Sequence, residues 1–363
     1  MRYSQLYRKP IDGGGLIVKS SIKEAIQIMD AFGALLYEGS LLGLHADELY
    51  DSLSHALQQT TSVEAIAQLQ TSWHQQGLCP PEHFAHQLPV MLSEHCHVNI
   101  ITNNAELVSK IEPYFYPSPL PGEQLTPLFV WSNDQIEGGF IASNTEFGGW
   151  HSRPTNVILA LFCVLVDLAY EASSGTVLLH AAGATRDGKT LVMPAVAGSG
   201  KSTLAANLLQ NGFRILNDDV LPLSPEGKLS CIYQPLKVKQ GSWPLAEALF
   251  PTLKEAEVFI RDSQIQLKLH RLSQDQHADS QRDYQASCII VPSYQAGASA
   301  QLQALMPTEA MLAFATADFR FVDFSDATLD WFSDWVCQLP AYRIIYGDSA
   351  QSMALIEQIV ETL

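Results

Sequence analysis

The sequence has few cysteines, no long apolar run and little positive charge, and each shortage excludes a class of protein. Its six cysteines show no CxxC spacing, and the first residues lack the apolar core of a signal peptide, so we expect a cytoplasmic protein. The longest apolar run, residues 157–169, is shorter than the roughly 20 residues of a membrane-spanning helix. With 21 basic against 38 acidic side chains, the formal net charge of -17 disfavours nucleic acid or an anionic membrane as the main partner.

What is present is typical of a globular protein with two parts. The chain has 363 residues, of which 47% are hydrophobic and 16% are charged. Apolar residues recur at helical spacing in segments 20–39, 46–59 and 62–78, which predicts a small, mainly helical module over residues 1–98. From residue 128 onward, strand-like and helix-like segments alternate, and hairpins outnumber crossovers. We therefore expect a larger α/β domain over residues 99–363 with a mixed sheet.

A glycine-rich loop gives the strongest functional signal. Residues 195–202, AVAGSGKS, match the P-loop (Walker A) pattern except that Ala195 stands where the pattern has its first glycine. Alanine can make that turn if its backbone φ is negative. An apolar strand precedes the loop and a helix follows it, so loop amides and the helix N-terminus can bind nucleotide phosphates. The expected nucleotide contacts are Ala197, Gly198, Ser199, Gly200, Lys201, Ser202 and Thr203.

Within this loop the residues have different expected roles. Lys201 would span the β- and γ-phosphates of a nucleoside triphosphate, and Ser202 would bind Mg²⁺. The alternative is a glycine-rich turn between strand and helix with a chance Lys-Ser pair.

Two acids follow the next apolar strand. Asp218 and Asp219 lie 17 and 18 residues after Lys201, where a carboxylate at a strand tip can hold Mg²⁺. One acid suffices for the metal, so we assign Asp218 to it and Asp219 to accepting the proton of an attacking hydroxyl. The alternative is a solvated Asp-Asp turn. His180 ends an apolar strand just before the loop strand, which can bring it beside the phosphates.

From about residue 176 onward, the sequence resembles the HPr kinase/phosphorylase superfamily, and in particular the HPr-kinase-related branch associated with peptide-modification gene clusters. The matching segments are Leu179-His180, residues 193–219, 234–242, 289–297 and 339–348. The resemblance implies a P-loop kinase domain of the HPr kinase/PEP carboxykinase-like type that uses ATP and Mg²⁺. It also implies that His180 lies near the phosphates, that Asp218 and Asp219 serve metal binding and proton transfer, and that a serine hydroxyl accepts the phosphoryl group.

The sequence departs from HPr kinases after the second acid. Those enzymes have an Arg-Gly-rich signature there, whereas this chain has Lys237 and Lys239 in an extended segment. Alternation places both lysines on one face, where they can bind phosphates or guide substrate, and Lys237 is the one that the family position favours. The alternative is a pair of ordinary surface lysines.

The choice of acceptor stays open at this level. The leading hypothesis is a serine kinase acting on a peptide or protein, with the module at 1–98 binding a leader peptide or other substrate, as the resemblance implies. A small-molecule kinase for an amino acid or sugar is the second hypothesis, and a nucleotide-gated binding protein without transfer activity is the third. The sequence leaves the oligomeric state open, a homo-oligomer included.

A cluster of histidines and cysteines invites a competing interpretation as a metal site. It comprises Cys79, His83, His86, His95, Cys96 and His97. Its spacing matches no standard zinc motif, because Cys79 has no second thiol close by. We therefore favour solvated side chains over a zinc site.

Overall fold

The computed structural model describes most of the chain, in the ranges 7–11, 15–20, 25–41, 44–75, 85–132, 140–144, 148–152, 157–173, 175–196, 198–261, 265–322 and 325–363. Contacts divide the chain into two compact units. The first holds residues 1–90, 97–113 and 117–164, and the second holds 91–96, 114–116 and 165–363. Within the described ranges, no helix is both long and apolar enough to cross a membrane.

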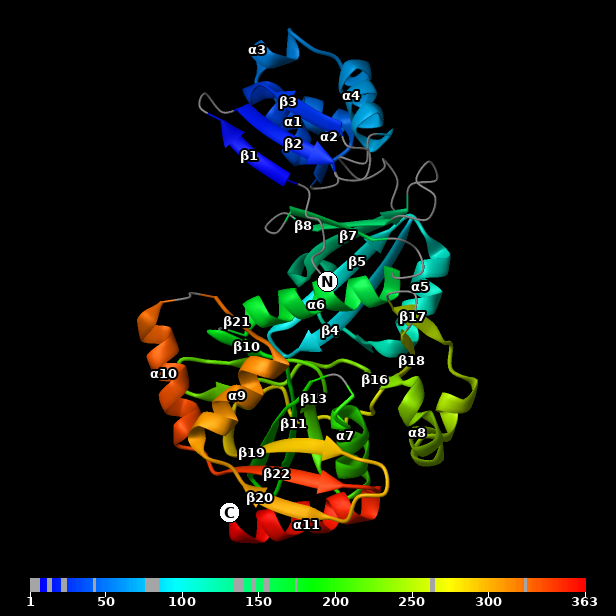
Figure 1. The fold of residues 1–363 in the computed structure, drawn as a ribbon. Coiled ribbons are helices and arrows are strands. Elements are labelled where there is room, and N and C mark those ends of the chain that lie inside the picture. The colour runs from blue at the N-terminus through cyan, green and yellow to red at the C-terminus, as the bar shows by residue number, and fades with distance from the viewer. Residues whose placement is uncertain are drawn as a thin grey trace. The chain divides into compact units, whose positions relative to one another are not determined.

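The first unit begins with a three-stranded antiparallel sheet followed by four helices (Figure 1). These elements are β1 (Tyr7–Ile11), β2 (Gly15–Ser20), β3 (Ala25–Met29), α1 (Ala31–Leu41), α2 (Ala46–Ser52), α3 (His55–Gln58) and α4 (Val63–Gln75). Tyr37 and Trp73 meet edge to face in their core, with ring centroids 5.4 Å apart.

The N-terminal segment differs from the sequence prediction. A helix is expected over 20–39, whereas the structure has strand β3 at residues 25–29 and begins its first helix at Ala31. The short run AIQIM is too brief for its periodicity to separate strand from helix, and pairing with β2 decides for the strand. The N-terminal segment therefore contains a three-stranded sheet beside its helices.

A second sheet follows, with the strand order β6-β4-β5-β7-β8-β9. Its strands are β4 (His86–Ser93), β5 (Cys96–Thr102), β6 (Tyr116–Pro117), β7 (Thr126–Ser132), β8 (Phe140–Asn144) and β9 (Gly148–Ser152). The helices α5 (Ala105–Ile111) and α6 (Val157–Ala172) belong to the same stretch of chain, and α6 is the helix expected from the apolar run. The expected domain boundary after residue 98 falls inside β5.

The second unit is built on a ten-stranded mixed sheet. Eight strands follow the order β13 (Arg214–Asn217), β11 (Ala181–Arg186), β12 (Lys189–Pro194), β19 (Tyr284–Tyr294), β15 (Lys228–Leu229), β14 (Leu221–Leu223), β10 (Val177–Leu179) and β21 (Phe319–Phe321). β22 (Ala341–Tyr346) also pairs with β19, and β20 (Gln301–Ala304) pairs with β22. β12, β19 and β22 are parallel neighbours, while the other pairings are antiparallel. The expected α/β class with a mixed sheet is confirmed.

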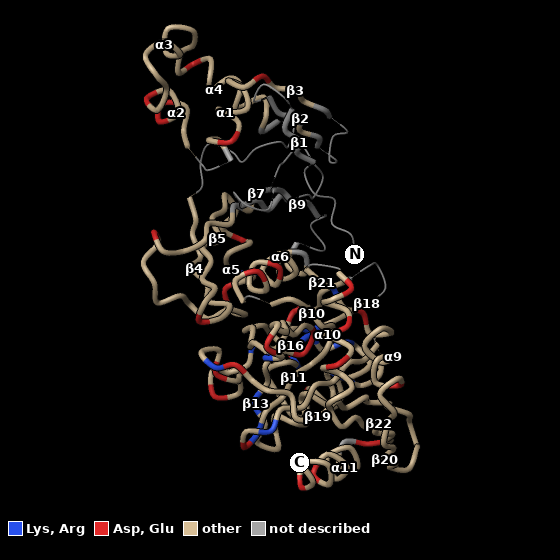
Figure 2. The backbone as a smooth tube through the Cα atoms, turned by 90° about the vertical axis from the view of Figure 1, so that its left-hand side faces the viewer, with Lys and Arg blue, Asp and Glu red and all other residues tan. Residues whose placement is uncertain are grey.

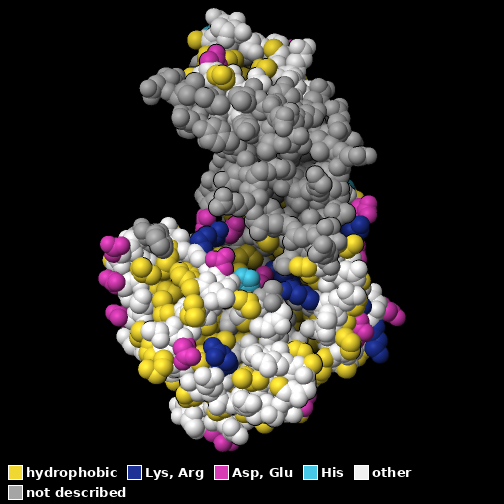
Figure 3. All heavy atoms as spheres, viewed as in Figure 1, with side chains coloured by type: hydrophobic (Ala, Val, Ile, Leu, Met, Phe, Trp, Pro, Cys, Tyr) yellow, Lys and Arg dark blue, Asp and Glu magenta, His cyan; other side chains and the backbone are white. Residues whose placement is uncertain are grey.

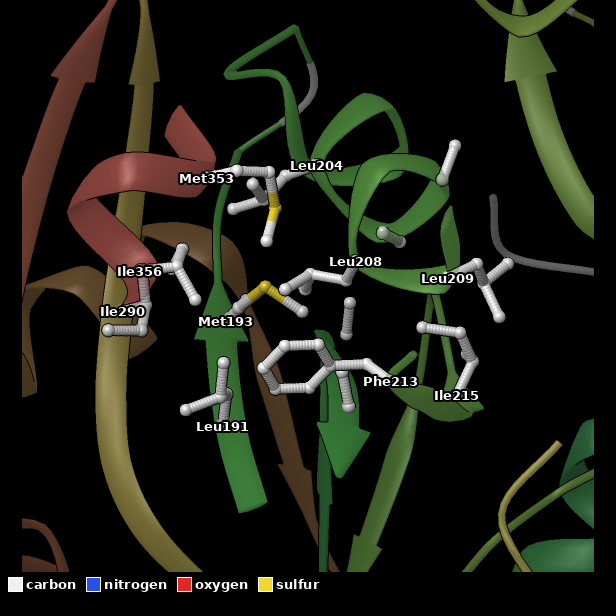
Figure 4. Close-up of a cluster of buried hydrophobic side chains, with 14 of the residues drawn as sticks. Leu191, Met193, Leu204, Leu208, Leu209, Phe213, Ile215, Ile290, Met353 and Ile356 are labelled. Carbon is white, nitrogen blue, oxygen red and sulfur yellow. The ribbon is translucent and has the colours of Figure 1, made fainter. Parts of the chain in front are cut away.

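Helices cover both faces of this sheet. Leu191 and Met193 of β12 pack under α7 (Lys201–Gln210) and α11 (Ser349–Thr362), and Figure 4 shows these side chains meeting. Val192, between them, faces α9 (Pro307–Ala317) and α10 (Asp326–Cys337) on the other side. Because successive side chains of β12 point to opposite faces and both faces are buried, the sequence of this strand is a continuous apolar run.

A smaller sheet contributes to the same core. It pairs β16 (Leu236–Lys239) with β18 (Ile265–His270), and β18 with β17 (Phe259–Arg261). The helix α8 (Trp243–Leu249) follows β16. Leu236 and Val238 point into the core that α7 also lines, so Lys237 and Lys239 lie on the opposite face of β16, as the alternation predicts.

The β11–β12 hairpin fixes where the functional loop lies. Its turn residues Asp187 and Gly188 both have positive φ, 52° and 77°, as the expected Asp-Gly hairpin turn requires. β11 is antiparallel to β12 on one side and to β13 on the other. β12 and β13 therefore run in the same direction, and the glycine loop and the two acids that follow these strands lie at the same edge of the sheet.

Candidate functional site

The glycine loop connects β12 to α7 with the backbone shape that its sequence predicts. Gly198 and Gly200 have φ of 88° and 96°, in the left-handed region that favours glycine. Ala195 is buried and is not among the residues with positive φ, so alanine fits where the general pattern has glycine. Ala197, an expected nucleotide contact, lies outside the described residues.

The two loop glycines have different surroundings. A Cβ added at Gly198 would meet nothing within 4 Å, so the space before this residue is open. A Cβ added at Gly200 would lie 2.5 Å from Oη of Tyr346 and 3.1 Å from Cβ of Tyr294. The loop is therefore packed against protein at one end and open at the other.

Lys201 is the first residue of α7 and is buried, with 8% of its surface exposed. Its ammonium finds no hydrogen-bond acceptor within the described part of the chain, and its nearest acid is Asp219, with Nζ 3.9 Å from Oδ1. Burial lowers the pKa of Lys201, while the Asp219 and Asp218 carboxylates oppose that shift. A buried ammonium costs free energy unless it is paired, so this position calls for an anionic partner.

Three basic groups lie around the carboxylate of Asp219. Its Oδ2 accepts a hydrogen bond of 2.6 Å from Nζ of Lys237, and its Oδ1 lies 3.3 Å from Nε2 of His180 and 3.9 Å from Lys201. Burial raises the pKa of Asp219, but Lys237, the His180 hydrogen bond and Lys201 together hold it well below its ordinary value. The structure thus brings three of the expected site residues together around the carboxylate of a fourth, Asp219.

Asp218, by contrast, is almost fully buried, with 3% of its surface exposed. Its Oδ2 accepts a hydrogen bond of 3.3 Å from the backbone N–H of Lys237. Burial and the neighbouring Asp219 charge raise the pKa of Asp218 to about 6. Two adjacent carboxylates therefore have pKa values shifted in opposite directions by their surroundings, which is a common feature of acid–base sites.

Asn217 is a residue of this site that sequence reasoning missed. Its Oδ1 accepts hydrogen bonds from the backbone N–H groups of Asp219 (2.8 Å) and Val220 (3.1 Å), and its Nδ2 donates to the carbonyl of Ile232 (3.1 Å). This turn, built on an asparagine side chain, fixes the two acids after β13. The signal was present in the sequence, because asparagine before a polar turn favours this geometry.

The first turn of α7 holds two more expected contacts. Ser202 is half-buried beside Lys201. The hydroxyl of Thr203 instead shares a 2.7 Å hydrogen bond with that of Ser242, at the end of the short helix η4 (Gln240–Ser242). Since the first amides of a helix lack intrahelical acceptors, the backbone N–H groups of Ser202 and Thr203 can still bind an anion.

The wider surface agrees with a local basic site on an acidic protein. In Figure 2, basic positions occur near β13 and β16, while acidic positions are spread over the chain. On the face that Figure 3 shows, a histidine has acidic and basic side chains near it. The basic side chains beside Asp219 can therefore attract an anion locally despite the net charge of -17.

The histidine and cysteine cluster forms no metal centre in the ranges that are described. Cys79 and His83 lie outside them. The buried His97 has its Nδ1 2.9 Å from the hydroxyl of Ser118. Among described residues, no group of three or more His, Cys, Asp or Glu side chains is placed to hold a metal ion.

Comparisons with known proteins add no family. Neither a protein-family model nor a curated protein matches this sequence. Its function must therefore be inferred from the residues themselves.

Proposed function

We propose that this chain is a kinase that uses ATP and Mg²⁺ to phosphorylate a hydroxyl, and that it belongs to the HPr kinase/phosphorylase superfamily that its motifs resemble. One observation carries the proposal: among the described residues, the buried Lys201 ammonium at the end of the glycine loop has no hydrogen-bond acceptor, while two acids lie at the same end of the sheet. A structural lysine would have its hydrogen bonds satisfied by its own protein, whereas a phosphate-binding lysine must keep its hydrogen bonds for the ligand.

The residues present fit a nucleoside triphosphate with its metal. Space is open before Gly198, and the first amides of α7 are available for phosphate oxygens. Lys201 and Lys237 would bind phosphates, together with Gly198, Ser199 and Gly200. Ser202 and Asp218 would hold Mg²⁺, which needs only one or two protein ligands beside the phosphates. The bound nucleotide supplies the phosphoryl group, and the metal neutralises charge on it.

Asp219 would accept the proton of the attacking hydroxyl, with His180 orienting it. As the side chains stand, the order of the two pKa values opposes this role, because Asp219 is the weaker base of the pair. The order of the two pKa values follows from the burial of Asp218 and from Lys237 beside Asp219. If Lys237 turns to phosphate, the pKa of Asp219 rises, and a metal beside Asp218 lowers the pKa of that residue. The assignment therefore predicts that nucleotide binding reverses the order.

The group that would accept the phosphoryl group is a separate part of the proposal. Serine in a peptide or protein is favoured by the resemblance, which also assigns leader-peptide or substrate binding to the N-terminal module. A free amino acid or sugar is the alternative acceptor for the same chemistry. A binding protein without transfer activity is a further alternative, since Lys201 alone would serve nucleotide binding. A cytoplasmic location, where ATP is available, belongs to the same proposal.

Incubation with labelled ATP, Mg²⁺ and a panel of peptides and metabolites tests these alternatives. A peptide kinase transfers label to peptides only, and a binding protein retains ATP without transfer. Asp219→Asn should slow transfer by about 100-fold to 10,000-fold, as loss of a general base does. Asp334→Asn, an exposed acid on α10, is the control and should leave the rate unchanged. Turnover that survives Asp219→Asn would exclude Asp219 as the base.

A further inference from the structure

A second side of the glycine loop, away from the two acids, is formed by the ends of β19 and β22. β12, β19 and β22 are parallel neighbours, and Figure 1 shows β19 and β22 side by side with their arrows in one direction. The carboxyl ends of parallel strands meet at one edge of a sheet, where ligands bind in open α/β folds. The segments after β19 and β22 therefore flank the loop on the side opposite β13.

Tyr294, the last residue of β19, is fixed directly against the loop. Its backbone N–H donates a hydrogen bond of 3.0 Å to the carbonyl of Ser199, and its Cβ is close to Gly200. Along β19, Cys288 and Ile290 face the core under α7. By alternation Tyr294 lies on the same face of the sheet as α7, at the end where that helix begins.

The side chain of Tyr294 is nevertheless 48% exposed. Among the side chains that the structure describes, no other aromatic residue is as exposed. Exposed single apolar residues are ordinary, so exposure alone assigns no function. What distinguishes Tyr294 is its position: its ring lies beside the glycine loop, and its backbone N–H is hydrogen-bonded to that loop.

The ring is also supported from behind. The ring of Tyr346, which is 1% exposed, lies 5.9 Å from that of Tyr294, centroid to centroid, at an interplanar angle of 60°. Its Oη donates to the carbonyl of Gly200 over 3.4 Å. The segments after the two strands are joined by a 3.0 Å hydrogen bond from N–H of Gln295 to the carbonyl of Tyr346.

Close backbone contact locks the same two segments together. A Cβ at Gly347 would lie 2.6 Å from the carbonyl oxygen of Ala298, so only glycine fits there without a shift. The backbone that carries Tyr294 is thus tightly packed, so the protein loses little conformational entropy when a flat ligand binds to the exposed ring.

We propose that Tyr294 forms the nucleobase side of the site, with its exposed ring stacking on the base of the nucleoside triphosphate whose phosphates the loop binds. This inference rests on the proposed function. Phosphates at the loop leave the sugar and base to extend past its edge, and the edge opposite the acids is the one that carries the aromatic ring. Stacking on an aromatic side chain stabilises any base, because every base has a flat π face.

Binding calorimetry with two probes, Mg·ATP and inorganic tripolyphosphate with Mg²⁺, separates the base from the phosphates. Tyr294→Ala should weaken ATP binding about tenfold, or about 1.4 kcal/mol, and change tripolyphosphate binding by less than about twofold. Tyr294→Phe keeps the ring and should retain the wild-type ATP affinity. Leu312→Ala on α9 removes another exposed apolar side chain, 65% exposed, and should change neither.

The outcomes separate this inference from the proposed function. Equal losses for both probes in Tyr294→Ala, or no loss for either, would overturn the nucleobase assignment while nucleotide binding stands. Wild-type protein that binds tripolyphosphate as tightly as ATP also overturns it. Wild-type protein that binds neither probe removes the proposed function itself. Circular dichroism of each variant verifies that the fold is intact.

Discussion

Two buried lysines in the second unit have opposite surroundings. Lys268, in β18, has a side chain that is 7% exposed, and its Nζ donates to Oε1 of Glu247 at 2.9 Å and to the carbonyls of Leu253 at 2.7 Å and Lys254 at 3.2 Å. It also lies 4.8 Å from the centre of the Trp243 ring. Lys201 is buried to a similar degree, with a side chain 9% exposed, and within the described ranges its ammonium has the 3.9 Å ion pair with Asp219 and no hydrogen-bond acceptor.

The difference separates a structural lysine from a functional one. An ammonium has three donors, and Lys268 uses all of them within the protein. The donors of Lys201 find no acceptor in the part of the chain that the structure describes, which costs stability, and proteins keep such a cost mainly at sites where a ligand offsets it. Substitutions at the two positions should therefore have opposite effects on stability and on activity.

The largest expected effect is on transfer by Lys201→Met. Removing the ammonium should lower the rate of phosphoryl transfer from ATP by about 1000-fold or more, because charge on the transferred group then lacks its main protein partner. The free energy of unfolding should stay equal or rise by up to about 1 kcal/mol, since a buried ammonium whose hydrogen-bond donors lack acceptors is replaced by an apolar chain of similar length. Steady-state kinetics and urea unfolding measure the two quantities. Destabilisation by several kcal/mol would make Lys201 structural and end the contrast.

Lys268→Met should reverse the pattern. It leaves Glu247 and two backbone carbonyls without their donor, which should lower the free energy of unfolding by about 2–3 kcal/mol. ATP affinity of the folded protein should not change, because the contacts of Lys268 lie in α8 and the segment after it. Urea unfolding at neutral pH and calorimetry test both parts. A loss of ATP affinity without a loss of stability would contradict the structural role.

A smaller effect, dependent on pH, is expected at Asp218. Its pKa is raised from 3.8 to about 6 by burial, so the folded state disfavours the charged form. The cost of burying the charged carboxylate lowers the free energy of unfolding in full above pH 6. It disappears below about pH 4, the pKa of Asp in the unfolded chain, because the carboxyl is then protonated in both states. Asp218→Asn should therefore stabilise the protein by about 1–2 kcal/mol at pH 7.5 and lose that gain as pH falls from 6 to 4.

Unfolding curves of Asp218→Asn and wild type at several pH values measure this gain. The same variant should need more Mg²⁺ for half-maximal transfer. A stabilisation that is equal at pH 7.5 and pH 4 would show that burial of the charge is not its cause.

The local part of the site could be predicted from the sequence. Between residues 189 and 219 the strand, loop, helix and acid-tipped strand follow from short-range rules, such as glycines with positive φ at 198 and 200 and the helix end at Asn211-Gly212. Each of these rules needs only neighbouring residues. The element types in this stretch are therefore confirmed.

The long-range part could not be predicted. The Lys237–Asp219 ion pair depends on the pairing of β16 with β18, whose partner residues lie about thirty positions further along the chain. Likewise, Tyr294 reaches the loop only because β19 pairs with β12, almost a hundred residues away. Residue spacing contains no information on such pairings, because they are set by packing of the whole sheet.

The smallest expected effect concerns the hydroxyl of Thr203, in the first turn of α7. Thr203 is an expected nucleotide contact, but its hydroxyl is hydrogen-bonded to that of Ser242 and so ties α7 to η4. Thr203→Val should lower the free energy of unfolding by about 0.5–1 kcal/mol, the usual contribution of one hydrogen bond. ATP affinity should fall less than about threefold, because the backbone N–H that a phosphate would use is kept.

Ser242→Ala is the control and should give the same loss of stability. The double variant should lose little more, since both changes remove the same hydrogen bond. A large loss of ATP affinity in Thr203→Val alone would instead show that this hydroxyl leaves Ser242 to bind the nucleotide. The contrast between donors that bond within the protein and donors kept for a ligand would then include Thr203 as well as the two lysines.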